Sequence, residues 1–315
     1  MATSPLLSLP GAVAAEAPDE GVAAHYGDPL REQRRLAEGR GFVDLSHRGV
    51  VRVSGPDRLS WLHSLTTQHL TDLKPGEATV TLVLSPHGHI EHAMYAVDDG
   101  EALWAHVEPG TAPALVAFLD KMRFMLRVEV EDLTEAYAVV FEPVPTAPDA
   151  DVLARVTAEG RELFLPRAEL ARYGAEHADP AGVWAYEALR IAAHRPRVGN
   201  ETDHRTIVHE VGWLDTAVHL NKGCYRGQET VARVQNLGRP PRRLVFLHVD
   251  GTEEKLPATG AAVELDGRQV GFVTSSARHH ELGTVALALV KRNTAVDAVL
   301  TADGVPASQE VVVPA

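Results

Sequence analysis

Residues 41–133 alternate between strand and helix patterns, and this order constrains the fold more than any other feature of the chain. The expected elements are a strand–turn–strand unit at 41–55, a helix at 57–70, a hairpin at 77–99, a second helix at 112–124 and a further strand at 125–133. The turn of the hairpin is "SPHG", residues 85–88. This order predicts an α+β layer, an antiparallel sheet with helices on one face.

Later segments extend this organisation. An apolar run at 136–144 starts another unit, and the clearest helix of the chain, 181–195, ends before a proline. The segment "NLGRPPRR", 236–243, predicts a linker or a stiff turn. Short strands follow it, with Asp266-Gly267 as a two-residue hairpin turn, and they predict a small β-barrel or sandwich.

The chain has 315 residues, which is too long for one typical domain. The predicted parts are a flexible N-terminus at 1–24, an N-terminal α+β domain at 25–135, a central α+β domain at 136–238 and a C-terminal β-barrel at 239–315. The first basic side chain is Arg31, so the mildly apolar N-terminus lacks the positive start of a secretion signal.

Charge and cysteine content narrow the expected environment. The net charge of −13 argues against general nucleic-acid binding. From Tyr186 to Arg243, however, ten Lys or Arg residues accompany six Asp or Glu residues, which indicates a local anion site. The single cysteine allows no internal disulfide, so a reducing cytoplasm is the expected compartment. No apolar run reaches the roughly 18 residues of a membrane helix, and no membrane partner is expected.

The single cysteine lies in "LNKGCYRGQE", residues 220–229, called here the cysteine loop. Gly223 and Gly227 bracket Cys224, and glycines allow positive φ angles and close approach to a ligand. Lys222, Arg226 and a predicted helix start just after the loop all favour a thiolate, which suits a nucleophile, a redox group or a metal ligand. Free cysteines also often fill space in a core, and the residues alone weigh the two roles equally.

Three other groups are weaker candidates. They are a possible metal site at His87, His89 and His92, a possible acid–base site at Asp203, His204, Arg205, His209 and Glu210, and a possible carboxylate or phosphate site at Arg195, Arg197 and Arg205. For the first two groups, solvated turn or loop residues are the simpler interpretation. For the arginines, surface salt bridges and anion binding weigh equally.

The motif "KGCYRGQETVAR" closely resembles the loop that marks the YgfZ family of folate-binding proteins, relatives of the glycine-cleavage T-protein. Similar stretches are "RGVVRVSGPDRLSWLHSLTTQHLTDLKPG", "YEALRIAAHRPRVG", "HEVGWLDTAVHLNKGCY" and "DGRQVGFVTSSA" with "GTVALALVKR". Together they cover about residues 40–295. The loop is highly specific, and the other stretches are moderately so.

The resemblance implies a three-domain ring of antiparallel-sheet α+β domains with a small C-terminal β-barrel, arranged around a folate cleft. It implies tetrahydrofolate as cofactor, and an accessory role in the assembly or repair of iron–sulfur clusters in enzymes, and through them in tRNA modification. The implied partners are iron–sulfur client or assembly proteins. The positions that match the family loop are Lys222, Gly223, Cys224, Tyr225, Gly227, Gln228 and Glu229, with Cys224 as the functional thiol.

Other positions follow the family less closely. Arg226 occupies a variable place in the loop, so only its charge recommends it. A folate glutamate tail could be held by Arg190, Arg195 or Arg197. Ala192 and His92 stand where the T-protein carries carboxylates near folate, which argues against a tetrahydrofolate-dependent aminomethyltransferase of the glycine-cleavage type. A third alternative is a non-catalytic module that binds a client protein or tRNA, although the charge disfavours tRNA.

Overall fold

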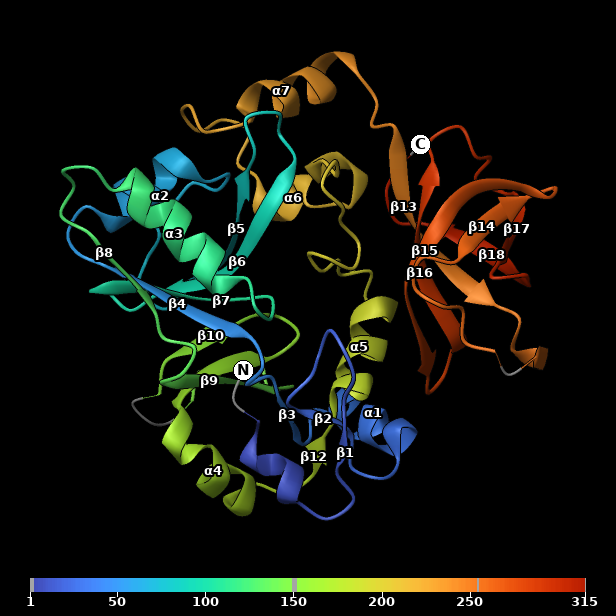
Figure 1. Ribbon diagram of the computed structural model, residues 1–315, viewed down its shortest axis with the longest axis horizontal. Coiled ribbons are helices and arrows are strands. Elements are labelled where there is room, and N and C mark those ends of the chain that lie inside the picture. The colour runs from blue at the N-terminus through green and yellow to red at the C-terminus, as the bar shows by residue number, and fades with distance from the viewer. Residues whose placement is uncertain (1–2, 149–151, 254, 315) are drawn as a thin grey trace. The chain divides into compact units, whose positions relative to one another are not determined.

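The computed structural model describes residues 3–148, 152–253 and 255–314 (Figure 1). The chain divides into two compact units. The first unit comprises residues 1–82 and 92–186, and the second comprises residues 83–91 and 187–315. The short segment 83–91, the tip of the first hairpin, therefore belongs with the C-terminal half of the chain.

The first sheet is formed by strands from the N-terminal part of the chain, in the order β5-β6-β7-β4-β8. The strands are β4 (Gly49–Ser54), β5 (Ala78–Leu84), β6 (Ile90–Asp98), β7 (Ala102–Val107) and β8 (Glu129–Asp132). Helices α2 (Arg58–Leu65) and α3 (Ala112–Met122) pack against this sheet (Figure 1). Ala112, Leu115 and Leu119 of α3 are buried, which is the spacing of one helical face. The strands and helices predicted over residues 41–133 are present, but the prediction missed β7, which lies between the hairpin and α3 in sequence and in the middle of the sheet.

The second sheet has the order β10-β11-β9-β3-β12. Its strands are β3 (Phe42–Asp44), β9 (Tyr137–Glu142), β10 (Ala154–Val156), β11 (Arg161–Pro166) and β12 (Pro180–Ala181). The other elements of this part are η1 (Pro5–Ser8), β1 (Val13–Ala14), β2 (Ala23–His25), α1 (Pro29–Ala37), η2 (Arg167–Glu169), α4 (Leu170–Glu176) and the start of α5 (Val183–Ala192). Since β3 pairs with β9, this sheet crosses the boundary predicted near residue 135.

The N-terminal segment differs from the expected flexible lead-in. Leu6 is 1% exposed and packs in a core cluster with Phe42, Leu163 and Tyr173. The hydroxyl of Ser4 donates a short hydrogen bond to the carboxylate of Asp44. The apolar side chains of this segment fill the second sheet's core, so its described residues are part of the fold.

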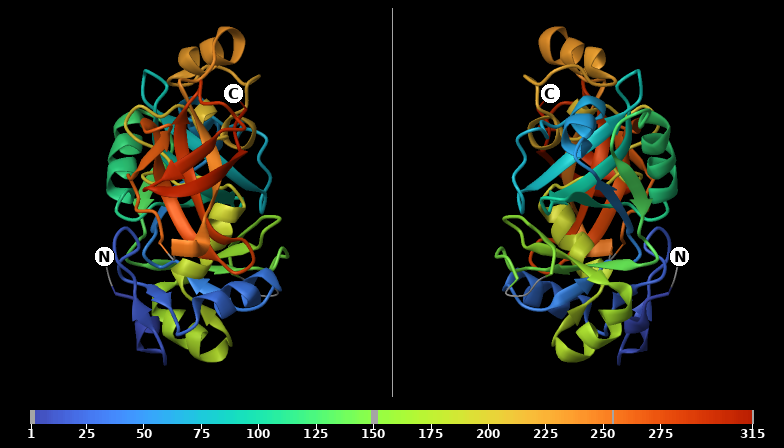
Figure 2. Two further views of the ribbon diagram at one scale, coloured as in Figure 1. Left: turned by 90° about the vertical axis from the view of Figure 1, so that its right-hand side faces the viewer. Right: turned by 90° about the vertical axis from the view of Figure 1, so that its left-hand side faces the viewer.

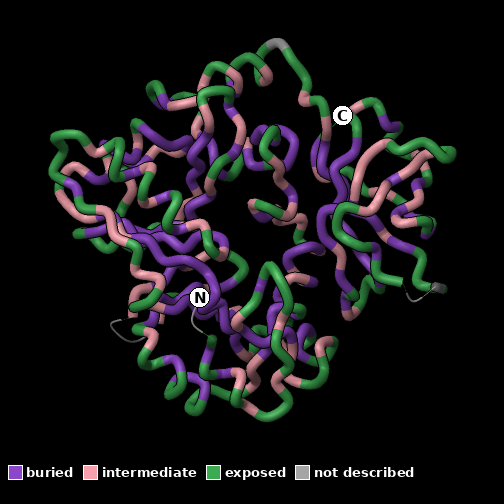
Figure 3. The backbone as a smooth tube through the Cα atoms, in the orientation of Figure 1, coloured by how far each residue is buried: buried purple, intermediate pink, exposed green. Residues whose placement is uncertain are grey.

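Unit two ends in a closed six-stranded barrel, β13-β16-β15-β14-β17-β18 (Figure 2). The strands are β13 (Arg242–Val249), β14 (Ala262–Leu265), β15 (Arg268–His279), β16 (Gly283–Lys291), β17 (Val299–Ala302) and β18 (Val305–Val311), with η4 at Gly251–Glu253. Strands β13 and β16 are largely buried, while the other barrel strands mix buried with partly or fully exposed residues (Figure 3). Asp266 and Gly267 join β14 to β15 with φ of 51° and 73°, as a two-residue hairpin turn requires. The α+β class and the C-terminal barrel are confirmed.

Before the barrel, the second unit consists of short helices and loops. They are the end of α5, η3 (Val208–Glu210), α6 (Leu214–Ala217) and α7 (Gln228–Leu237). The predicted linker at 236–243 corresponds to the end of α7, a short connection and the start of β13.

A buried ion cluster connects β7 of the first sheet to the second sheet. Glu162 on β11 lies 2.7 Å from the guanidinium of Arg155 and 3.0 Å from the imidazole of His106. Burial opposes ionisation of Glu162, but Arg155 and His106 hold the pKa of this carboxyl far below its ordinary value of 4.5. Burial lowers the pKa of His106, so Arg155 supplies most of the compensating charge.

We expect Glu162→Gln to lower the free energy of unfolding by ~3 kcal/mol at neutral pH, because the substitution leaves Arg155 buried without its counter-charge. The folded-state pKa of Glu162 is depressed, so its contribution is present above pH 4.5 and declines as the pH falls below that value. The difference between wild type and variant should therefore shrink in acid. Urea denaturation across this pH range measures it.

The matched control is Glu131→Gln, which removes a partly exposed partner of Arg52. It should cost less than about 1 kcal/mol. Equal costs for the two substitutions would contradict the role given to the buried cluster.

Candidate functional site

The cysteine loop lies against the tip of the β5–β6 hairpin, and both belong to the second unit. The backbone N–H of Ile90 donates to the carbonyl of Thr206 at 3.0 Å, and His89 forms an isolated antiparallel bridge with Ile207. The tip is therefore fixed by backbone hydrogen bonds to a segment that leads into η3.

Two glycines allow the hairpin tip to approach the start of α7. Gly227 is the N-cap of α7 and has φ of 83°, and a Cβ atom there would lie 2.6 Å from the carbonyl oxygen of Ser85. Gly88 has φ of 79°, and its Cβ would lie 2.6 Å from the Cβ of Thr230. Both positions require glycine, because contact and backbone angle each exclude a side chain.

Cys224 is exposed, whereas Lys222, two residues before it, and Tyr225, directly after it, are buried. Lys222 is 6% exposed, and its ammonium lies 4.9 Å from the ring centroid of Tyr225, which is 8% exposed. Burial lowers the pKa of Lys222 to about 8 and raises the pKa of Tyr225 to about 12. The loop thus holds a thiol open to solvent beside an amine that loses its proton more readily than an ordinary lysine.

Arg226 fastens the loop to the hairpin. Its Nη1 lies 3.0 Å from a carboxylate oxygen of Glu91. The predicted helix is present as α7, but it begins at Gln228, four residues after Cys224. Glu229 is exposed in the first turn of α7, and Gly223 is exposed as well. The backbone N–H of Gln228 donates to the carbonyl of Tyr225 at 3.2 Å. The thiolate character expected of Cys224 stays a prediction.

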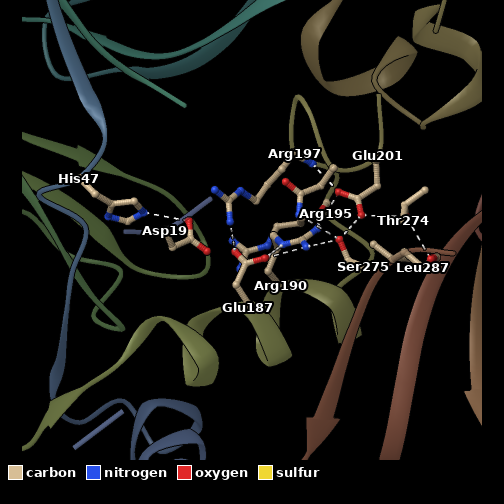
Figure 4. Close-up of polar contacts among 11 residues, drawn as sticks. Asp19, His47, Glu187, Arg190, Arg195, Arg197, Glu201, Thr274, Ser275 and Leu287 are labelled. Atoms are coloured by element: carbon tan, nitrogen blue, oxygen red, sulfur yellow. Dashed lines mark hydrogen bonds and ion pairs between the residues drawn. The ribbon is translucent and has the colours of Figure 1, made fainter. Parts of the chain in front are cut away.

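Two of the three arginines considered for a folate tail lie in a buried ion network (Figure 4). Arg190 is 3% exposed and lies 2.7 Å from Glu187 and 2.9 Å from Glu201. Arg197 is also 3% exposed and lies 3.0 Å from Glu187. Carboxylates of the chain itself therefore neutralise both guanidiniums.

This network also reaches the barrel. The Nη2 of Arg190 donates to the hydroxyl of Ser275 at 2.9 Å, and Thr274 donates to Glu201 at 3.0 Å. Arg195 is partly exposed, and its backbone carbonyl accepts a bond from Arg190 at 2.7 Å. Of the three arginines, Arg195 has the most accessible side chain. Sequence reasoning missed Glu187 and Glu201, although the spacing of Glu187 and Arg190 along a helix is that of an ion pair.

Two of the candidate acid–base residues, Asp203 and Glu210, form ion pairs. Asp203 lies 2.6 Å and Glu210 lies 2.8 Å from the guanidinium of Arg242 at the start of β13. The hydrogen bond from Arg242 helps hold the pKa of Asp203 far below its usual range. These carboxylates thus connect η3 and the segment before it to the barrel. His209 is buried, and burial lowers its pKa, while His204 and Arg205 are exposed.

The structure does not bring His87, His89 and His92 together into a metal site. The rings of His87 and His89 are 6.2 Å apart. His92 is half-buried on β6, and burial lowers its pKa. Within residues 3–148, 152–253 and 255–314, no group of three or more His, Cys, Asp or Glu side chains is arranged to hold a metal ion.

We expect Gly227→Ala to lower the free energy of unfolding by ~2 kcal/mol, because alanine resists positive φ and its Cβ would overlap Ser85. Gly223→Ala is the matched control in the same loop. A Cβ at Gly223 meets no atom within 4 Å, so this variant should unfold like wild type in urea. Equal destabilisation by both substitutions would show that the close approach to the hairpin is not what the loop depends on.

Two domain models match the chain. The GCVT N-terminal domain matches residues 22–161, and the glycine cleavage T-protein C-terminal barrel domain matches residues 242–311. Among the described residues, none of the helices combines the length and apolar character needed to cross a lipid bilayer.

Several curated proteins are similar in sequence. A chloroplastic protein of Arabidopsis thaliana, named as a transferase, is 28% identical over 82% of this chain and 66% of its own length, so the chain spans slightly less than two thirds of that relative. An aminomethyltransferase of Koribacter versatilis is 27% identical over 79% of this chain and 76% of its own. One of Streptomyces coelicolor is 27% identical over 84% and 82%.

The fold is also found in a solved structure. The glycine cleavage system aminomethyltransferase T from Bartonella henselae superposes with a TM-score of 0.82 at 19% identity, covering 97% of this chain and 94% of that one. At this identity the likeness establishes the fold. This chain therefore carries a GCVT N-terminal domain and a glycine cleavage T-protein C-terminal barrel domain, and it has the T-protein fold.

Proposed function

We propose that this protein is an accessory factor for the assembly or repair of iron–sulfur clusters in enzymes, and that it acts through Cys224. The observation that carries the proposal is the exposed thiol in a loop in which Lys222, Tyr225 and Arg226 are held by contacts. Tyr225 and Lys222 are buried beneath the loop, and Arg226 is paired with Glu91. A loop that only filled space would bury its cysteine, as free cysteines usually are.

A single thiol limits how many ligands the protein can supply to an iron–sulfur cluster. Thiolates are the standard ligands of iron–sulfur clusters, and a complete cluster site in a protein uses four of them or a mixture with histidine. Cys224 is the only cysteine of the chain, so it can supply one such ligand. The remaining ligands would come from a client or assembly protein, which makes the cluster or its iron a substrate in transit. A partner of this kind also fits the acidic net charge of −13, which disfavours direct nucleic-acid binding.

The residues present do not fit tetrahydrofolate held by carboxylates and arginines. Arg190 and Arg197 are already neutralised by Glu187 and Glu201. Ala192, near the end of α5, offers no acceptor for the amino and ring N–H groups of a pterin. No step of the proposed function therefore passes through tetrahydrofolate.

An aminomethyltransferase is the second candidate function. The names of the Koribacter and Streptomyces relatives favour it. His92 and Ala192 count against it, because neither can act as the carboxylate that the resemblance implies at these positions. Ammonia release from an aminomethyl-loaded carrier protein, dependent on tetrahydrofolate, would support this alternative over the first.

The role of the thiol is tested by rescue in a strain that lacks the gene. Wild type and Gly223→Ala should restore the activity of iron–sulfur enzymes, while Cys224→Ser should restore less than about a tenth of it, because an alcohol is a poor ligand and nucleophile at neutral pH. Circular dichroism and urea denaturation should show that Cys224→Ser folds like wild type, since the side chain is exposed. Full rescue by Cys224→Ser would overturn the proposed role.

The folate question is tested by titrating purified protein with tetrahydrofolate under anaerobic conditions. Ala192→Glu should bind about tenfold more tightly than wild type, because one charge-assisted hydrogen bond contributes roughly 1.5–3 kcal/mol. Ala193→Glu, at the exposed neighbouring position, is the matched control and should bind like wild type. Tight binding by wild type with no gain in Ala192→Glu would show that the missing carboxylate is not needed.

A further inference from the structure

Two adjacent arginines at the start of β13 differ in their surroundings. Arg242 lies beside the carboxylates of Asp203 and Glu210. Arg243 is 0% exposed, yet no carboxylate of the described residues lies within ion-pair distance of it. A buried guanidinium without a counter-charge is unusual, because removing a charge from water costs several kcal/mol unless it is compensated.

Arg243 occupies the interior of the barrel at one end. On β13, Val245, Leu247 and Val249 point into the barrel core, and Arg243 shares their alternation. Gln309 on β18 follows the same alternation as the core residue Ala307. The charged end of Arg243 therefore lies where the apolar core of the barrel stops.

A segment between β16 and β17 covers this end. The Nη2 of Arg243 donates to the backbone carbonyl of Thr294 and to the Oε1 of Gln309, both at 3.0 Å. The Nε2 of Gln309 donates to the carbonyls of Ala295 and Ala298, at 2.8 and 3.0 Å. These bonds orient Gln309 so that its oxygen faces the guanidinium, and they hold the covering segment in place.

Several donors at this end have no acceptor. A guanidinium has five N–H groups, and Nη2 uses two of them, which leaves three on Nε and Nη1. Nε and Nη1 are buried and make no hydrogen bond, and the same is true of the Thr294 hydroxyl. Among the described side chains of the barrel, 242–252 and 255–311, these are the only buried polar atoms in that condition.

The unmatched groups therefore lack acceptors and a negative charge. A water molecule could accept from them, but its own two hydrogens would then need acceptors, and it would leave the charge of Arg243 uncompensated. An anion would accept these hydrogen bonds and would also compensate the charge of Arg243. The atoms are closed off from bulk solvent, which favours a small ion over a bulky oxyanion.

We propose that this end of the barrel binds a small monovalent inorganic anion of the size of chloride, held by the N–H groups of Arg243 and the hydroxyl of Thr294. The ion completes the barrel by neutralising a cation that has no carboxylate within ion-pair distance among the described residues. The stability of the protein then depends on the identity of the anion in solution, and not only on ionic strength.

The test is thermal unfolding of the full chain in chloride and in gluconate at equal ionic strength. Chloride at about ten times its dissociation constant should raise the wild-type midpoint by ~3 °C relative to gluconate, whose anion is too large for the site. Arg243→Gln should lose this difference, because the charge is gone. Arg268→Gln, an exposed cation on β15, is the matched control and should keep it.

Thr294→Val retains the guanidinium and removes only the hydroxyl, so it provides the test if Arg243→Gln does not fold. It should reduce the chloride-dependent shift by at least half. Equal midpoints of wild type in chloride and gluconate would overturn the proposal, because water alone would then suffice. A shift that persists unchanged in the foldable variant would overturn it as well, because the ion would act elsewhere.

Discussion

The cysteine loop depends on one close backbone contact, between the turn of the β5–β6 hairpin and the residues just before α7. Gly88 and Gly227 make this contact possible, since either Cβ would overlap an atom of the opposing segment. The contact fixes where α7 begins and therefore where the preceding loop runs. The loop is then held by the contact between Lys222 and Tyr225 and by the ion pair of Arg226 with Glu91. Cys224 is left exposed to solvent.

The charged groups around this loop divide into structural pairs and available ones. Arg190 and Arg197 are bound by Glu187 and Glu201, and Arg242 is bound by Asp203 and Glu210. Three of the ten cations between Tyr186 and Arg243 are thus neutralised by carboxylates of the same stretch. This is why the T-protein fold by itself does not establish the T-protein's chemistry here: the fold positions a loop and a helix, and the side chains on them decide what they do.

Local patterns predicted much of the fold. The "SPHG" turn, the helix that became α5 and the Asp266-Gly267 hairpin follow from residues adjacent in sequence, so they could be identified before the structure was known. The pairing of β3 with β9 and the packing of Leu6 against Phe42 join residues far apart in the chain, and no local pattern specifies them. The predicted boundary near residue 135 and the flexible N-terminus differ from the structure for that reason.

The candidate site was predictable to a similar degree. The spacing of glycines and cations around Cys224 identified the loop, but only the structure reveals that Lys222 is buried and that Arg226 is paired. The central claim, that the thiol acts on iron–sulfur clients, is tested most directly in a purified system. The measurement is the rate at which an apo iron–sulfur enzyme regains activity with native protein or with protein alkylated at Cys224 by iodoacetamide. Native protein should accelerate recovery and alkylated protein should not; equal acceleration by both would contradict the account.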